Sequence, residues 1–147
     1  MAEWVRRFRE NIYSTADLWL LIRIAAWLSL EPLLIRALPL PRLLAWHTPT
    51  RPPASPEQRR RVRIYAQFLL SDRMDVFERT CLKRSLVLYR FLHGEPKPPR
   101  FFIGVRSENG RLQGHSWVTL GEAPLYPGEN NGYAVTFAFP PPQASRP

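Results

Sequence analysis

The strongest local constraint in this chain is the pair Asn109-Gly110, which stands between two segments rich in β-forming residues. An Asn-Gly pair favours a two-residue turn whose twist matches that of an antiparallel hairpin. We therefore predict a hairpin with a first strand over residues 101–105 and a return strand over residues 112–120. A further strand is expected over residues 133–139, where a run of prolines ends it.

The two-residue turn also predicts which residues face one another across the hairpin. Gly104 should lie opposite His115, and Phe102 opposite Trp117. Since side chains alternate along a strand, His115 and Trp117 share one face with Gly104. We expect the glycine to leave room beside the imidazole for a thiol and a substrate backbone, which makes Gly104 and Trp117 the predicted substrate-binding residues.

The first half of the chain is expected to be helical. The apolar run over residues 18–30 is shorter than the roughly 20 residues that a membrane-spanning helix needs. It predicts a core or partner-binding helix, with peripheral membrane contact as the alternative. After a proline-rich linker, Ser55 and Gln58 form a capping box that begins the next helix. The arginines at 59, 60, 61 and 63 are expected to form a solvated face, with a positional role left open.

Cys81 is the only cysteine, so no internal disulfide can form and a reducing, cytoplasmic location is expected. It opens an apolar helical pattern that should end at Gly94. A cysteine nucleophile needs a thiol at a helix start that faces an imidazole, because the helix N-terminus and the imidazolium both stabilise the thiolate. We predict Cys81 as the nucleophile and His115 as the general base, with the Cys81 N–H contributing to an oxyanion hole. The nearby Arg84 either lowers the thiol pKa or is a surface charge.

A third residue should accept the other imidazole N–H and hold the ring in the useful tautomer. The candidates after His115 are Glu129, Glu122 and Asn130, favoured in that order. The three histidines and one cysteine have no metal-ligand spacing, and no phosphate-binding or dinucleotide motif is present. We therefore expect neither a metal nor a cofactor.

The net charge of +9 would attract an acidic partner, whether nucleic acid, an anionic membrane or an acidic peptide, and by itself favours none of them. The main prediction is a cysteine peptidase that does not bind nucleic acid. Two alternatives remain open. One is a transglutaminase-like acyl transferase, in which an amine resolves the acyl-enzyme. The other is a non-catalytic basic module that binds a membrane or nucleic acid and keeps Cys81 for structure.

Three segments resemble the lasso peptide biosynthesis B2 proteins, the stand-alone leader peptidases of the transglutaminase-like, papain-related superfamily. They are the segment 81–89 with Cys81, the segment Phe102-Ile103-Gly104-Val105, and the segment Gly114-His115-Ser116-Trp117-Val118. The resemblance implies a thiol protease that removes the leader from a ribosomally synthesised precursor peptide. It also implies a separate PqqD-like leader-binding protein as partner and a macrolactam cyclase that acts afterwards. The family's third residue is usually an aspartate, and none follows His115 here, so Glu129 or Glu122 must substitute.

The expected fold is α+β, with a helical N-terminal half packed on a small antiparallel sheet and the catalytic cysteine at a helix N-terminus. We predict one transglutaminase-like, papain-like domain over residues 1–147. Its parts are an apolar helical front segment (1–46), a proline-rich linker (47–56), the catalytic core (57–140) and a mobile tail (141–147). The apolar front segment is a candidate docking surface for the leader-binding partner or the cyclase.

Overall fold

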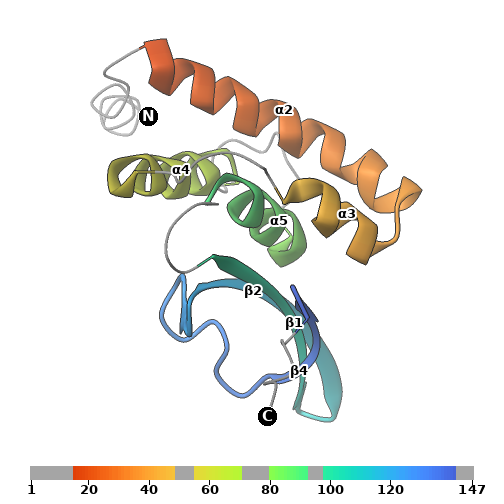
Figure 1. The fold of residues 1–147 in the computed structure, drawn as a ribbon. Coiled ribbons are helices and arrows are strands. Elements are labelled where there is room, and N and C mark those ends of the chain that lie inside the picture. Colours follow the sequence, from red (N-terminus) through yellow and green to blue (C-terminus); the bar gives the residue numbers. More distant parts are fainter. Residues whose placement is uncertain (1–14, 49–54, 71–79, 93–97, 142–147) are drawn as a thin grey trace, which may run out of the picture.

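The computed structural model of the protein describes residues 15–48, 55–70, 80–92 and 98–141. These residues form a layer of helices above a curved antiparallel sheet, as the α+β prediction required (Figure 1). The helices are α2 (Thr15–Ala37), α3 (Leu40–His47), α4 (Pro56–Leu69) and α5 (Cys81–Phe91). The strands are β1 (Pro99–Glu108), β2 (Arg111–Leu120), β3 (Ala123–Pro124) and β4 (Ala134–Phe139).

The hairpin of β1 and β2 has the predicted turn and the predicted register. Asn109 and Gly110 have φ angles of 53° and 74°, as this two-residue turn requires. Gly104 pairs with His115, and the residues on either side follow in step. Both strands extend beyond the predicted segments. The sheet order is β3-β2-β1-β4, so the last strand returns to the free edge of β1.

The core lies between the helical layer and one face of the sheet. On α5, Leu86 and Tyr89 are fully buried, and on β1 the ring of Phe101 packs edge-on against Tyr89 at a centroid distance of 6.3 Å. Helix α4 begins as predicted, because Ser55 Oγ accepts a hydrogen bond from the Gln58 N–H at 3.1 Å. These contacts fix α4 and α5 against each other and α5 against the sheet.

Helix α2 is longer than predicted. The sequence indicated an end near residue 30, but the helix continues through Pro32 to Ala37. Pro32 removes one backbone N–H from the helix, yet it lies on the exposed side. On the inner side Leu20, Ile24 and Leu28 pack into the core, and this burial outweighs the local cost of the proline.

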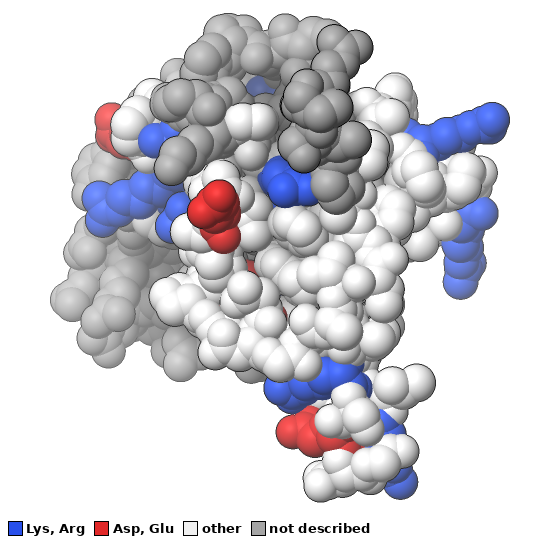
Figure 2. All heavy atoms as spheres, turned by 60° about the horizontal axis from the view of Figure 1, so that its bottom comes forward, with Lys and Arg blue, Asp and Glu red and all other residues white. Residues whose placement is uncertain are grey.

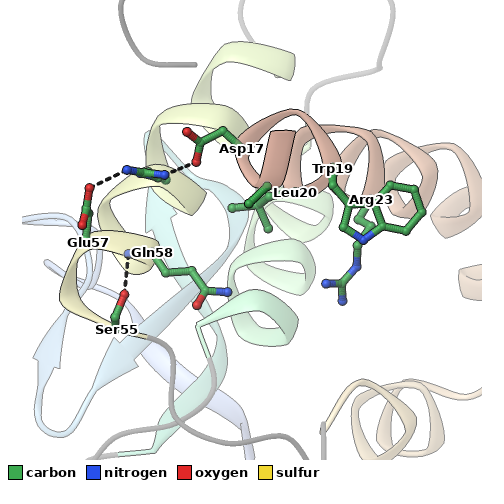
Figure 3. Close-up of a pocket in the computed structure, with 9 residues that line it drawn as sticks. Asp17, Trp19, Leu20, Arg23, Ser55, Glu57 and Gln58 are labelled. Atoms are coloured by element: carbon green, nitrogen blue, oxygen red, sulfur yellow. Dashed lines mark hydrogen bonds and ion pairs between the residues drawn. The ribbon is translucent and has the colours of Figure 1, made fainter. Parts of the chain in front are cut away.

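An ion-pair cluster joins α2 to the start of α4, which corrects the expectation of a solvated arginine face. Arg61 donates to both Asp17 and Glu57, and Asp17 is almost completely buried. A pocket of about 270 Å³ lies beside this cluster, lined by Trp19 and Arg23 among others (Figure 3). Arg61 therefore positions α2 on α4.

Several predicted boundaries shift or cannot be compared. The predicted linker began at residue 47, but His47 is the last residue of α3, where its buried ring contacts the Leu43 carbonyl oxygen at 2.7 Å. Helix α5 ends at Phe91, earlier than predicted, and Gly94 lies outside the described residues. Most of the predicted linker and of the predicted tail also lie outside them.

Candidate active site

Cys81 is the first residue of α5, as the sequence predicted. Thr80 caps this helix, because its hydroxyl oxygen accepts a hydrogen bond from the Lys83 N–H at 3.2 Å. The thiol is half-buried and is not in a disulfide. Cys81 therefore stands at the N-terminal end of α5, which is the positive end of the helix dipole.

A buried hydrogen bond fixes α5 against the strand that carries the predicted base. Ser116 Oγ donates to Ser85 Oγ at 3.3 Å. Ser85 lies one helical turn after Cys81, and Ser116 directly follows His115. The fold therefore brings the helix start and the middle of β2 into the same part of the molecule.

The alternation of β2 places His115 on the sheet face that points away from α5. Ser116 contacts the helix, so its neighbours His115 and Trp117 lie on the opposite face. There the imidazole packs against Tyr133 at a centroid distance of 5.2 Å, and Trp117 stacks on Phe102 at 5.6 Å. Within the described part of the chain, no hydrogen bond joins His115 to Cys81. The structure brings the two elements together, with no hydrogen bond between the two reacting groups among the described residues.

Gly104 does not leave the open space that we expected beside the imidazole. A Cβ atom at this position would lie 2.8 Å from the Trp117 ring and 3.0 Å from the Ala134 carbonyl oxygen. The indole fills the space above the glycine, and Trp117 is itself only 3% exposed. The glycine is therefore required for the packing of the indole. The substrate-binding roles of Gly104 and Trp117 stay predictions.

Glu129, the favoured third residue, binds a different partner from the one we predicted. Its carboxylate accepts a hydrogen bond from Arg84 on α5, and the Arg84 guanidinium also lies over the Tyr126 ring at 5.2 Å. Burial raises the pKa of Glu129 above its ordinary value, and the Arg84 charge opposes this effect. No hydrogen bond connects Glu129 with His115 among the described residues. The role of Glu129 in a triad therefore stays a prediction.

The other two candidates for the third residue lie on the surface. Glu122 is exposed in the turn after β2, and Asn130 is exposed in the loop before β4. Among the described residues no hydrogen bond joins either of them to the imidazole, so the structure gives no reason to prefer them over Glu129.

The electrostatic surroundings keep His115 neutral near pH 7. Burial lowers its pKa, and the charges of Arg84 and Arg106 lower it further. A neutral imidazole can accept a proton, which is the state a general base needs. Sequence reasoning had named Arg84 only as a possible influence on the thiol, and it had not identified Tyr133 or Arg106 as neighbours of the imidazole.

Charged side chains do not cover this side of the molecule evenly. In Figure 2, which turns the sheet side forward, basic side chains project around the edge and uncharged residues form most of the centre. The pocket of Figure 3 is elsewhere, between α2 and α4, and neither Cys81 nor His115 lines it. Among the described residues, no group of three or more His, Cys, Asp or Glu side chains could hold a metal ion.

A cysteine at a capped helix start, packed on a hairpin that carries a histidine, is the scaffold of an enzyme that forms a thioester with an acyl group. Comparison with family models agrees with this class. Residues 24–138 match the model described as the Transglutaminase-like superfamily, and the chain belongs to this superfamily. Its members generally have cysteine-protease or acyltransferase activity. No curated protein and no solved structure matched the chain.

Proposed function

We propose that this protein is a cysteine protease that removes the leader from a ribosomally synthesised lasso peptide precursor. The observation that carries the proposal is the position of Cys81 at the capped start of α5, packed on β2 with His115, in a chain of the transglutaminase-like superfamily. The resemblance of the segments around both residues to leader peptidases supports the substrate class. A cytoplasmic location agrees with a single free thiol.

In the proposed reaction, neutral His115 accepts the proton of the Cys81 thiol, and the resulting thiolate attacks the carbonyl carbon at the junction of leader and core. The resulting oxyanion is stabilised by N–H groups at the start of α5. The C–N bond then breaks, and the imidazolium of His115 gives its proton to the leaving core amine. Water adds to the thioester with His115 as base, which releases the leader acid and restores the thiol.

This reaction requires a hydrogen bond between the imidazole and the thiol, and the described residues of the free protein show none. Catalytic hydrogen bonds are often long in a free enzyme and tighten when the substrate is bound. The proposal therefore includes a substrate complex in which a PqqD-like leader-binding protein delivers the precursor. The macrolactam cyclase would act on the released core.

The test is cleavage of a precursor peptide by the purified protein with its leader-binding partner, followed by mass spectrometry. Wild type should release leader and core, and Cys81→Ala and His115→Gln should each lose at least about a hundred-fold in rate. Arg111→Gln, at an exposed position beside the hairpin turn, is the control and should cleave normally. Normal cleavage by Cys81→Ala would refute the proposal. A leader product joined to an amine instead of a free acid would indicate the acyl-transferase alternative.

A further inference from the structure

Helix α2 has an outer face that no described element covers. Its inner side packs on α4 and α5, and the helix lies at the outside of the helical layer (Figure 1). Large apolar side chains nevertheless continue around the outer side, with Trp19 61% exposed and Leu33 64% exposed. Trp46 of α3, which packs edge-on against Trp27 of α2, is 60% exposed. We call this surface the outer α2 face; its residues are Leu18, Trp19, Ile22, Leu30, Leu33 and Trp46.

Within residues 18–48, which carry this face, the exposed charges are positive. The nearest exposed carboxylate described is Glu57 of α4, which lines the same pocket as Trp19 and pairs with Arg61. Between residues 18 and 48 the only acidic residue is Glu31, which is completely buried. Asp17, just before this segment, is also buried and is bound by Arg61. Arg36 and Arg42, in contrast, are both exposed. An apolar strip whose own helices expose only cations is complementary to a membrane, which has an apolar interior and an anionic surface.

We propose that the outer α2 face binds in the plane of an anionic phospholipid membrane. Exposed indoles favour the boundary between headgroups and acyl chains, and each arginine near the surface is attracted by anionic lipids. By length and composition alone, α2 is also apolar enough to cross a membrane. Its inner side, however, holds Leu20, Ile24 and Leu28 in the core, and crossing would remove them from it. The inner side of α2 therefore stays in the core, and only the outer α2 face enters the membrane interface.

This inference is independent of the proposed protease activity, because it concerns a surface that contains neither Cys81 nor His115. The experiment is co-sedimentation of the purified full chain with vesicles, without any precursor peptide. One set contains phosphatidylcholine with about a third phosphatidylglycerol, and the other contains phosphatidylcholine alone. Wild type should bind the anionic vesicles and bind the neutral ones far less.

Three substitutions and one matched control test which residues of α2 and α3 bind the membrane. Leu33→Glu removes an apolar contact and adds a negative charge, so it should weaken binding about ten-fold or more. The matched control is Leu112→Glu, because Leu112 is 80% exposed on the hairpin, and its binding should equal that of wild type. Arg36→Gln and Arg42→Gln should each weaken binding to anionic vesicles by about five-fold. Circular dichroism of each variant verifies that it is folded.

Three outcomes would overturn the inference. If wild type fails to bind the anionic vesicles, the outer α2 face does not recognise lipid. If Leu33→Glu instead converts a wild-type dimer into a monomer in analytical ultracentrifugation, a second copy of the chain covers this face. If vesicle-bound protein resists extraction by alkaline carbonate, α2 crosses the bilayer and does not lie on it. Precursor cleavage in the absence of vesicles should stay normal in Leu33→Glu, which separates this test from the test of protease activity.

Discussion

Glu31 should destabilise the folded protein at neutral pH, and Glu31→Gln should remove this effect. The carboxyl group is completely buried, and neither of its oxygens has a hydrogen-bond partner among the described residues. Burial raises its pKa from 4.5 to about 9, although the charge of Lys83 lowers it in part. The carboxyl group is therefore protonated in the folded protein at neutral pH and ionised in the unfolded chain.

The size of the effect follows from the linkage between proton binding and folding. Because the folded state keeps a proton that the unfolded chain releases, stability falls as pH rises from 4.5 toward about 9. Each pH unit in this window costs about 1.4 kcal/mol. At pH 7.5 the cost is about 4 kcal/mol, which corresponds to roughly 8–16 °C in Tm for a domain of this size. Glutamine has nearly the same shape and cannot ionise, so Glu31→Gln should be the more stable protein at this pH.

The assay is urea denaturation of wild type and Glu31→Gln at one-unit intervals from pH 5.5 to 8.5. Taking the difference between the two proteins cancels the titration of the histidines, which both proteins share. We expect the difference to grow by about 1.4 kcal/mol per unit. The exposed Glu122→Gln is the control and should follow wild type. A difference that does not change with pH, or a less stable Glu31→Gln at pH 7.5, would refute the reasoning and show an ionised Glu31 paired with Lys83.

Three further predictions concern the candidate active site. Gly104→Ala should lower the free energy of unfolding by about 1–3 kcal/mol because its Cβ would meet the Trp117 ring, and an unchanged denaturation midpoint would contradict this. Arg84→Glu should slow precursor cleavage because it breaks the ion pair with Glu129. If that pair is only structural, the double variant Arg84→Glu, Glu129→Arg should recover most of the rate. No recovery would instead favour Glu129 as the triad acid. Burial is the larger cause that lowers the pKa of His115, and the Arg84 charge is the next, so Arg84→Gln should raise this pKa. An NMR titration of the imidazole that shows no rise would disprove the electrostatic contribution.

The parts of the fold that sequence predicted well are determined by neighbouring residues. The Asn109-Gly110 turn needs only its own backbone conformation, and once it is placed, every pair across the hairpin follows. The start of α4 at Ser55 and the start of α5 at Cys81 likewise depend on capping within a few residues. Such features can be predicted from the sequence because they form without tertiary contacts.

The errors concern choices that only tertiary packing makes. Alternation shows that His115 and Trp117 share a face, but it does not show which face the helices cover. Each face of β2 carries a large apolar residue, Val118 on one and Trp117 on the other. The helical layer packs on the face of Val118, so the imidazole lies on the other face. The partner of Glu129 was missed for a related reason. Arg84 is 45 positions away in sequence, and no local pattern connects the two.

The layer order also allows membrane binding and peptide cleavage to occur together. From the outside inward, α2 is followed by α5 and then by the sheet (Figure 1). His115 lies on the sheet face that points away from these helices. If the outer α2 face rests on lipid, this sheet face is therefore turned away from the membrane, where a leader-binding partner can deliver the precursor. The two proposed surfaces then do not compete, and cleavage should persist when the protein is bound to anionic vesicles. If cleavage is lost on vesicles and Leu33→Glu restores it, then lipid blocks the site and this arrangement of the layers is wrong.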